Sequence, residues 1–116
     1  MSTFVTTSHG ADFFGEDRHL TKSLASLADY ARGCLAADER DQLVQLLTAQ
    51  EMAEVGTEQS IPAAVAGRLA DQLGRIARNH YLRSKRLAEA AALLAAAAGR
   101  AAADGEPWQW RIETSP

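Results

Sequence analysis

Two histidines and three carboxylates fall within eleven residues of one another near the start of this sequence. The segment begins at His9, ends at His19 and includes Asp12, Glu16 and Asp17. Imidazole nitrogens and carboxylate oxygens are ligands for zinc, manganese and iron, and a histidine beside a carboxylate can also perform acid–base catalysis. The spacing matches no metal-binding motif, however, and acidic segments interrupted by glycine are usually solvated loops. We therefore predict a loop, with a metal site at His9, Asp12, Glu16 and His19 as the less favoured alternative.

A second candidate for chemistry is a basic segment, residues 75–86, which holds five of the twelve lysines and arginines. Arginines can contact phosphates, and a tyrosine can stack on a base. The candidate residues for binding a nucleic acid or an acidic partner are Arg75, Arg78, Tyr81, Arg83, Lys85 and Arg86. The chain as a whole carries a net charge of −3, whereas nucleic-acid-binding domains are usually basic. We therefore favour pairing of this segment with the protein's own acidic residues, such as Asp38, Glu39 and Asp41, or with those of a second protomer.

Other catalytic signatures are missing from the sequence. It has no Gly-x-Ser-x-Gly nucleophile elbow, no phosphate-binding loop and no Gly-x-Gly-x-x-Gly. A single cysteine, Cys34, excludes an internal disulfide, and its neighbours Leu27, Ala31 and Leu35 indicate a small buried hydrophobic residue. We predict a protein that is not an enzyme, needs no cofactor and has no inferred small-molecule substrate.

The charge is divided unequally along the chain. Residues 1–60 carry four basic and ten acidic residues, and residues 61–116 carry eight basic and five acidic residues. Such a division can organise contacts between helices, between protomers or with a polyanion. The N-terminus lacks the features of a signal peptide, and the alanine-rich stretch Ala88–Ala103 is interrupted by Glu89, Gly99 and Arg100. These patterns predict a cytoplasmic protein without a membrane span.

The hydrophobic periodicity predicts four helices and two strands in a single domain, residues 1–116. Apolar residues at helical spacing place helices at 20–36, 38–53, 61–78 and 82–103. Residues 3–7 are rich in β-branched side chains, and residues 107–113 alternate between apolar and polar, so both segments are expected to be strands. Phe13 and Phe14 are expected to anchor the intervening loop to the core. The predicted fold is mostly α, a largely antiparallel four-helix bundle whose short terminal strands pair alongside it.

The last helix and the segment that follows it resemble those of an uncharacterised family of small actinobacterial proteins. The resemblance rests on Gly105-Glu106-Pro107-Trp108-Gln109-Trp110 after an alanine-rich helix, and on Ile61-Pro62-Ala63 followed by Leu69-Ala70-Asp71. It implies a bacterial source of high GC content and carries no activity, because the function of that family is unknown.

These features favour a small interaction or adaptor module that acts through a protein partner and associates with itself. The alanines of the last helix allow a neighbouring helix to approach closely, either within the chain or across a two-fold interface. The alternatives are a nucleic-acid-associated regulator that uses the basic segment and a metal-dependent activity in the His9–His19 loop.

Overall fold

The computed structural model describes residues 2–79 and 82–114, which form four helices, one short 3-10 helix and four strands. Tyr81, one of the candidate binding residues, lies outside the described residues. The elements in chain order are β1 (Thr3–Ser8), β2 (Glu16–Leu20), α1 (Thr21–Cys34), α2 (Ala37–Ala49), η1 (Gln50–Met52), β3 (Glu58–Ile61), α3 (Ala63–Ala77), α4 (Lys85–Asp104) and β4 (Trp108–Thr114).

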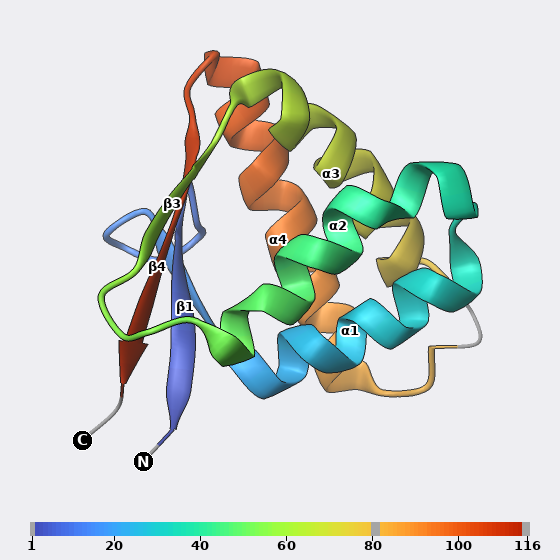
Figure 1. Cartoon of the computed structure of the whole chain (residues 1–116). Coiled ribbons are helices and arrows are strands. Elements are labelled where there is room, and N and C mark those ends of the chain that lie inside the picture. The colour runs from blue at the N-terminus through green and yellow to red at the C-terminus, as the bar shows by residue number, and fades with distance from the viewer. Residues whose placement is uncertain (1, 80–81, 115–116) are drawn as a thin grey trace.

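The strands form one antiparallel sheet in the order β2-β1-β4-β3 (Figure 1). The two terminal strands pair at its centre, with Thr3 opposite Thr114 and Thr7 opposite Trp110. β2 flanks β1 and β3 flanks β4. The prediction of a mostly α bundle with minor strands is therefore wrong, because the protein is an α+β fold with a four-stranded sheet.

The two edge strands lack the hydrophobic alternation from which strands are predicted. β2 points Asp17 and His19 toward the helices, since they lie opposite the inward residues Thr7 and Val5. β3 has four residues, of which only Ile61 is buried and apolar. Edge strands can be short and polar because hydrogen bonds to one neighbour, rather than burial on both sides, hold them in place. This polarity explains why the sequence predicts a loop, rather than a strand, at residues 16–19.

All four helices lie on one side of the sheet, and no helix formed by the described residues covers its other side (Figure 1). β4 shows this arrangement in its burial pattern, because Trp108, Trp110 and Ile112 are buried while Gln109 and Arg111 are exposed. The two indole rings meet edge to face, with centroids 5.1 Å apart and planes at 89°. These tryptophans are the largest fully buried side chains among the described residues, so they join the sheet to the helical layer.

The alanine-rich face of α4 packs against α3 within the chain. Ala91, Ala97, Ala98 and Ala101 are fully buried, together with Leu94. The contact is close, because a Cβ atom added at Gly67 of α3 would lie 3.5 Å from the Cβ atom of Ala102. The small side chains of α4 therefore serve intramolecular packing, which was one of the two expectations, and this face is not available to a second protomer.

No helix in the described part of the chain combines the length and the apolar character that a membrane crossing requires.

Candidate functional site

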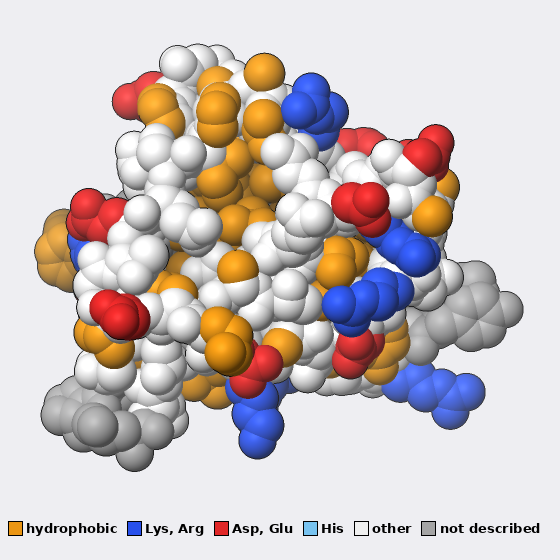
Figure 2. All heavy atoms as spheres, in the orientation of Figure 1, with side chains coloured by type: hydrophobic (Ala, Val, Ile, Leu, Met, Phe, Trp, Pro, Cys, Tyr) orange, Lys and Arg blue, Asp and Glu red, His pale blue; other side chains and the backbone are white. Residues whose placement is uncertain are grey.

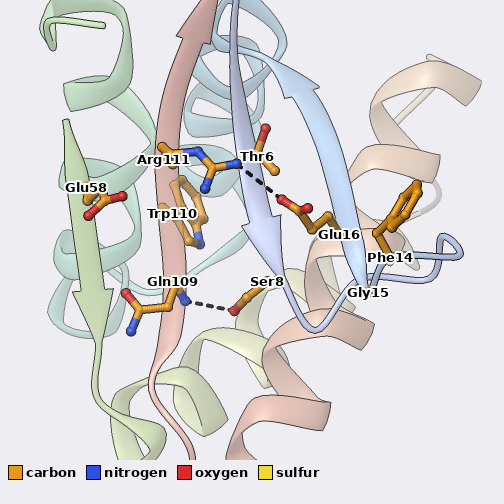
Figure 3. Close-up of a pocket in the computed structure, with 9 residues that line it drawn as sticks. All are labelled: Thr6, Ser8, Phe14, Gly15, Glu16, Glu58, Gln109, Trp110 and Arg111. Carbon is orange, nitrogen blue, oxygen red and sulfur yellow. Dashed lines mark hydrogen bonds and ion pairs between the residues drawn. The ribbon is translucent and has the colours of Figure 1, made fainter. Parts of the chain in front are cut away.

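The open face of the sheet is lined by outward side chains from all four strands. They are Phe4, Thr6, Ser8, Glu16, Arg18, Leu20, Glu58, Ser60, Gln109, Arg111 and Glu113. A depression of about 520 Å³ lies on this face between Glu58 of β3 and Phe14, which precedes β2 (Figure 3). Arg111 lies in the middle of it and points toward Glu16. The depression is therefore polar at its floor, with one aromatic ring at its rim.

Arg111 of β4 is held by two carboxylates, one on its own strand and one on β2, which lies beyond β1 in the sheet. Its guanidinium lies 2.8 Å from Glu113 and 3.4 Å from Glu16. The hydrogen bond with Glu113 raises the pKa of Arg111 above its ordinary value, and the charge of Glu113 adds to the effect. The pKa of Glu113 is lowered first by the Thr6 hydroxyl, which donates to it at 2.7 Å. Arg111 is thus committed to its two carboxylates and is a poor site for an anionic ligand.

The loop between β1 and β2 presents two phenylalanine rings to solvent. Phe13 is 95% exposed and Phe14 is 79% exposed, and the rings meet edge to face with centroids 5.3 Å apart. The expectation that they anchor the loop to the core is wrong. The loop is closed by its own hydrogen bonds, so it does not need the rings for its shape.

Asp12 and the loop backbone provide these bonds. One carboxylate oxygen of Asp12 accepts hydrogen bonds from the backbone N–H groups of Phe14 at 2.9 Å and Glu16 at 2.7 Å. The Gly10 N–H donates to the Gly15 carbonyl, and the Gly15 N–H donates to the Asp12 carbonyl. Gly15 has a φ of 72°, a conformation that side chains rarely adopt. The Asp and Gly residues of this segment predict a loop, but they do not by themselves indicate that hydrogen bonds fix its shape.

The four predicted metal ligands are not brought together. Asp12 shapes the loop, and Glu16 lies beside Arg111. His19 is buried on the inner face of the sheet, where desolvation lowers its pKa despite the opposing charge of Asp17. The predicted site at His9, Asp12, Glu16 and His19 is therefore corrected, because Glu16 and His19 lie on opposite faces of β2 and cannot share an ion.

His9 lies instead beside the turn between α4 and β4. Its Nε2 atom is 3.3 Å from a carboxylate oxygen of Glu106, and its Nδ1 atom is 2.8 Å from the Ser8 hydroxyl oxygen. Asp104 completes a group of three metal-ligating side chains around this point. Sequence reasoning missed Asp104 and Glu106 because nearly the whole chain separates them from His9.

Ser8, His9 and Glu106 are linked in the same series as the nucleophile, base and acid of a catalytic triad, with the imidazole between the hydroxyl and the carboxylate. The Ser8 oxygen, however, already accepts a hydrogen bond from the backbone N–H of Gln109 at 2.9 Å. This bond ties Ser8 at the end of β1 to the first residues of β4 and gives its hydroxyl a structural role between the two central strands.

The basic segment is only partly engaged with the acidic half of the chain. Arg75 lies 2.7 Å from Glu39 of α2 and 3.3 Å from Asp71 one turn earlier in α3. The hydrogen bond with Glu39 is the largest cause of the raised pKa of Arg75. Acidic and basic side chains lie side by side where α1 ends and α2 begins (Figure 2). Four further members of the segment show no ion pair within the described residues: Arg78, Arg83, Lys85 and Arg86.

Cys34 is half-buried at the end of α1, where it packs against the edge of the core. Burial raises the pKa of its thiol, while a hydrogen bond with Asn79 and the charge of Arg75 act in the opposite direction. A raised pKa reduces the thiolate fraction, so the residue suits a packing role better than a reactive one.

Comparisons of the chain with known proteins place it in a family to which no activity is assigned. No curated protein and no solved structure matches the chain. A family model described as Domain of unknown function (DUF7739) matches residues 10–111. This range includes the Gly105–Trp110 segment and every helix, and it covers most of the chain. The chain belongs to the DUF7739 family.

Proposed function

We propose that this chain is a non-enzymatic interaction module that acts through a protein partner, with the Phe13–Phe14 loop as its main contact. The observation that carries the proposal is the exposure of two adjacent aromatic rings on a loop whose backbone is fixed by hydrogen bonds. Aromatic residues are enriched at the centres of protein interfaces. A contact on a fixed loop also loses little conformational entropy on binding.

The open face of the sheet extends this contact surface. Phe14 lines the rim of the depression, and the floor is made of neutralised or uncharged polar groups such as Arg111, Thr6 and Gln109 (Figure 3). An aromatic contact beside a polar surface is the usual anatomy of a non-obligate interface. A second copy of this chain is the first partner to test, since the pattern of charge along the sequence permits pairing between protomers.

The test of the contact is to replace both rings with serine, in the variant Phe13→Ser/Phe14→Ser. Sedimentation velocity over a range of protein concentrations measures self-association. Photocrosslinking in cells through a reactive group at the exposed position 11, which the double variant leaves unchanged, captures other partners. The control is Met52→Ser, because Met52 is 88% exposed on a different part of the surface. We expect the double variant to lose association or crosslinking while the control retains it. Unchanged association and crosslinking in the double variant would refute the proposal.

The non-enzymatic part of the proposal is tested at Ser8. The substrate is p-nitrophenyl acetate, which exposed nucleophiles of any protein hydrolyse slowly. If Ser8 has only a structural role, His9 does not activate it, and Ser8 adds nothing to this background rate. Ser8→Ala should then leave the rate unchanged. A rate that falls at least tenfold in Ser8→Ala and in His9→Gln, with folding retained, would show a catalytic serine instead.

A further inference from the structure

The turn between α4 and β4 is fastened to the end of β1 by three hydrogen bonds. The Arg100 Nε donates to the His9 carbonyl at 2.6 Å, and the Trp108 Nε1 donates to the Ser8 carbonyl at 3.0 Å. The backbone N–H of Gln109 donates to the Ser8 hydroxyl oxygen at 2.9 Å. The backbone of His9 is therefore held in a fixed place relative to residues 104–106.

Three side chains converge at this place. His9 contributes an imidazole nitrogen, and Asp104 and Glu106 each contribute a carboxylate oxygen, all within 4.8 Å of one another. In a tetrahedral zinc site, bonds of about 2.0–2.2 Å place neighbouring ligand atoms about 3.3–3.5 Å apart. The His9 Nε2 atom and the Glu106 Oε1 atom are already 3.3 Å apart. Asp104 is exposed, so rotation of its side chain can bring its carboxylate to the same spacing.

The imidazole has a partner that can orient it for metal binding. Ser8 Oγ lies 2.8 Å from His9 Nδ1. In the tautomer that carries hydrogen on Nδ1, this nitrogen donates to Ser8 and the lone pair of Nε2 points toward the carboxylates. Histidines that bind metals usually donate their second ring N–H to such a partner, which fixes the ring.

The position at the end of α4 favours a cation. The last turn of a helix carries partial negative charge, and the last turn of α4 contains no basic residue. Asp104 and Glu106 add two negative charges at this end. Arg100 is the basic side chain hydrogen-bonded to this cluster, and its Nε is committed to the His9 carbonyl. The negative end of α4 and the carboxylates of Asp104 and Glu106 repel one another, and a divalent cation bound between them would reduce this repulsion.

We propose that His9, Asp104 and Glu106 bind a divalent transition metal ion, with water at the remaining position. One imidazole and two carboxylates form a mixed nitrogen and oxygen donor set that suits Zn²⁺. The ion would join the base of the Phe13–Phe14 loop to the α4–β4 turn. The proposal is independent of the partner-binding function, because the site and its ligands are distinct from the two rings.

The test is isothermal titration of the chelator-treated, untagged full chain with ZnCl2. We expect one ion per chain and a rise in the thermal midpoint, because an ion that binds the folded state stabilises it. Glu106→Gln and Asp104→Asn keep the shape of each side chain and remove its charge, and each should weaken Zn²⁺ binding at least tenfold. Glu89→Gln, which removes an exposed carboxylate elsewhere on α4, is the matched control and should bind as the native chain does.

Substitution with Co²⁺ separates this site from binding at Cys34. A nitrogen and oxygen site gives visible d–d absorption without the near-ultraviolet charge-transfer band that a thiolate ligand produces. The proposal is overturned if saturable Zn²⁺ binding is absent. It is also overturned if Glu106→Gln and Asp104→Asn bind Zn²⁺ as tightly as the Glu89→Gln control, or if the thiolate band appears.

Discussion

The two tryptophans of β4 offer a matched pair of substitutions that tests how the core is built. Trp108 is 0% exposed and Trp110 is 1% exposed, and each ring packs against the other. Their indole N–H groups differ. The Trp108 Nε1 donates to the Ser8 carbonyl at 3.0 Å, whereas the Trp110 Nε1 is buried without a hydrogen-bond partner. Replacement of each tryptophan by phenylalanine removes a similar volume, so the volume term largely cancels between the two variants.

The hydrogen-bond term does not cancel. Trp108→Phe deprives the half-buried Ser8 carbonyl of a donor, which costs about 1–3 kcal/mol. Trp110→Phe removes a buried N–H group that has no hydrogen-bond partner. The removal of this unpaired group stabilises the variant by about 1–3 kcal/mol and so offsets part of the packing energy lost with the smaller ring. We therefore expect Trp108→Phe to be less stable than Trp110→Phe by at least about 2 kcal/mol.

Urea denaturation followed by far-ultraviolet circular dichroism measures this difference, because the helical signal does not depend on either indole. The midpoint should fall further for Trp108→Phe, with the slope of the transition unchanged in both variants. Equal destabilisation of the two variants, or a greater loss in Trp110→Phe, would refute the assignment of the Ser8 bond as a structural contact.

Three further predictions follow from particular side chains. His19 has a lowered pKa in the folded chain, so the unfolded chain binds a proton first as the pH falls below about 6.5. The free energy of unfolding should therefore fall with decreasing pH in this range, and His19 can contribute at most about 1.4 kcal/mol per pH unit to this fall. Urea titrations at several pH values measure the pH dependence, and His19→Leu should remove the contribution of His19. A Cβ atom at Gly10 would clash with the backbone of Glu16, so Gly10→Ala should destabilise the β1–β2 hairpin by about 1–3 kcal/mol. The exposed Phe13 has no such contact, and Phe13→Ser should change the free energy of unfolding by less than about 0.5 kcal/mol. Because the chain carries a net charge of −3, whereas nucleic-acid-binding domains are usually basic, we expect no DNA binding at low salt. Binding that weakens steeply as salt rises and is lost in an Arg83→Glu variant would instead favour a nucleic-acid partner.

Helices were easier to place from the sequence than strands because their burial is periodic. The prediction of a helix at 61–78 rests on Ile61, Val65, Leu69, Leu73 and Ile76. All are buried in the structure except Val65, which is half-buried, and the helix itself begins at Ala63 and ends at Ala77. In β4 the alternation of Trp108, Trp110 and Ile112 likewise matches their burial. Both patterns arise because one side of each element faces the core.

The edge strands and the site could not be predicted in the same way. β2 has Asp17 and His19 on its inward side, and such polar positions give no hydrophobic signal. The convergence of His9 with Asp104 and Glu106 depends on which strands are neighbours, which no local pattern encodes. The exposure of Phe13 and Phe14 goes against the usual preference of phenylalanine for the interior, so composition predicted the opposite of what the structure shows.

The proposed ion and the proposed contact surface are connected through the β1–β2 hairpin, and this connection can be measured. His9 begins the loop that presents Phe13 and Phe14, and the backbone from Gly10 to Gly15 is closed by hydrogen bonds. An ion held by His9 would restrain one end of this loop and so reduce the entropy that partner binding must overcome. Partner affinity should then increase when Zn²⁺ is added to the native chain but not when it is added to Glu106→Gln. Partner affinity that does not change with Zn²⁺ in the native chain would mean that the loop is already fixed by Asp12 and that the two sites act separately. An equal increase in both proteins would mean that Zn²⁺ acts through a different site.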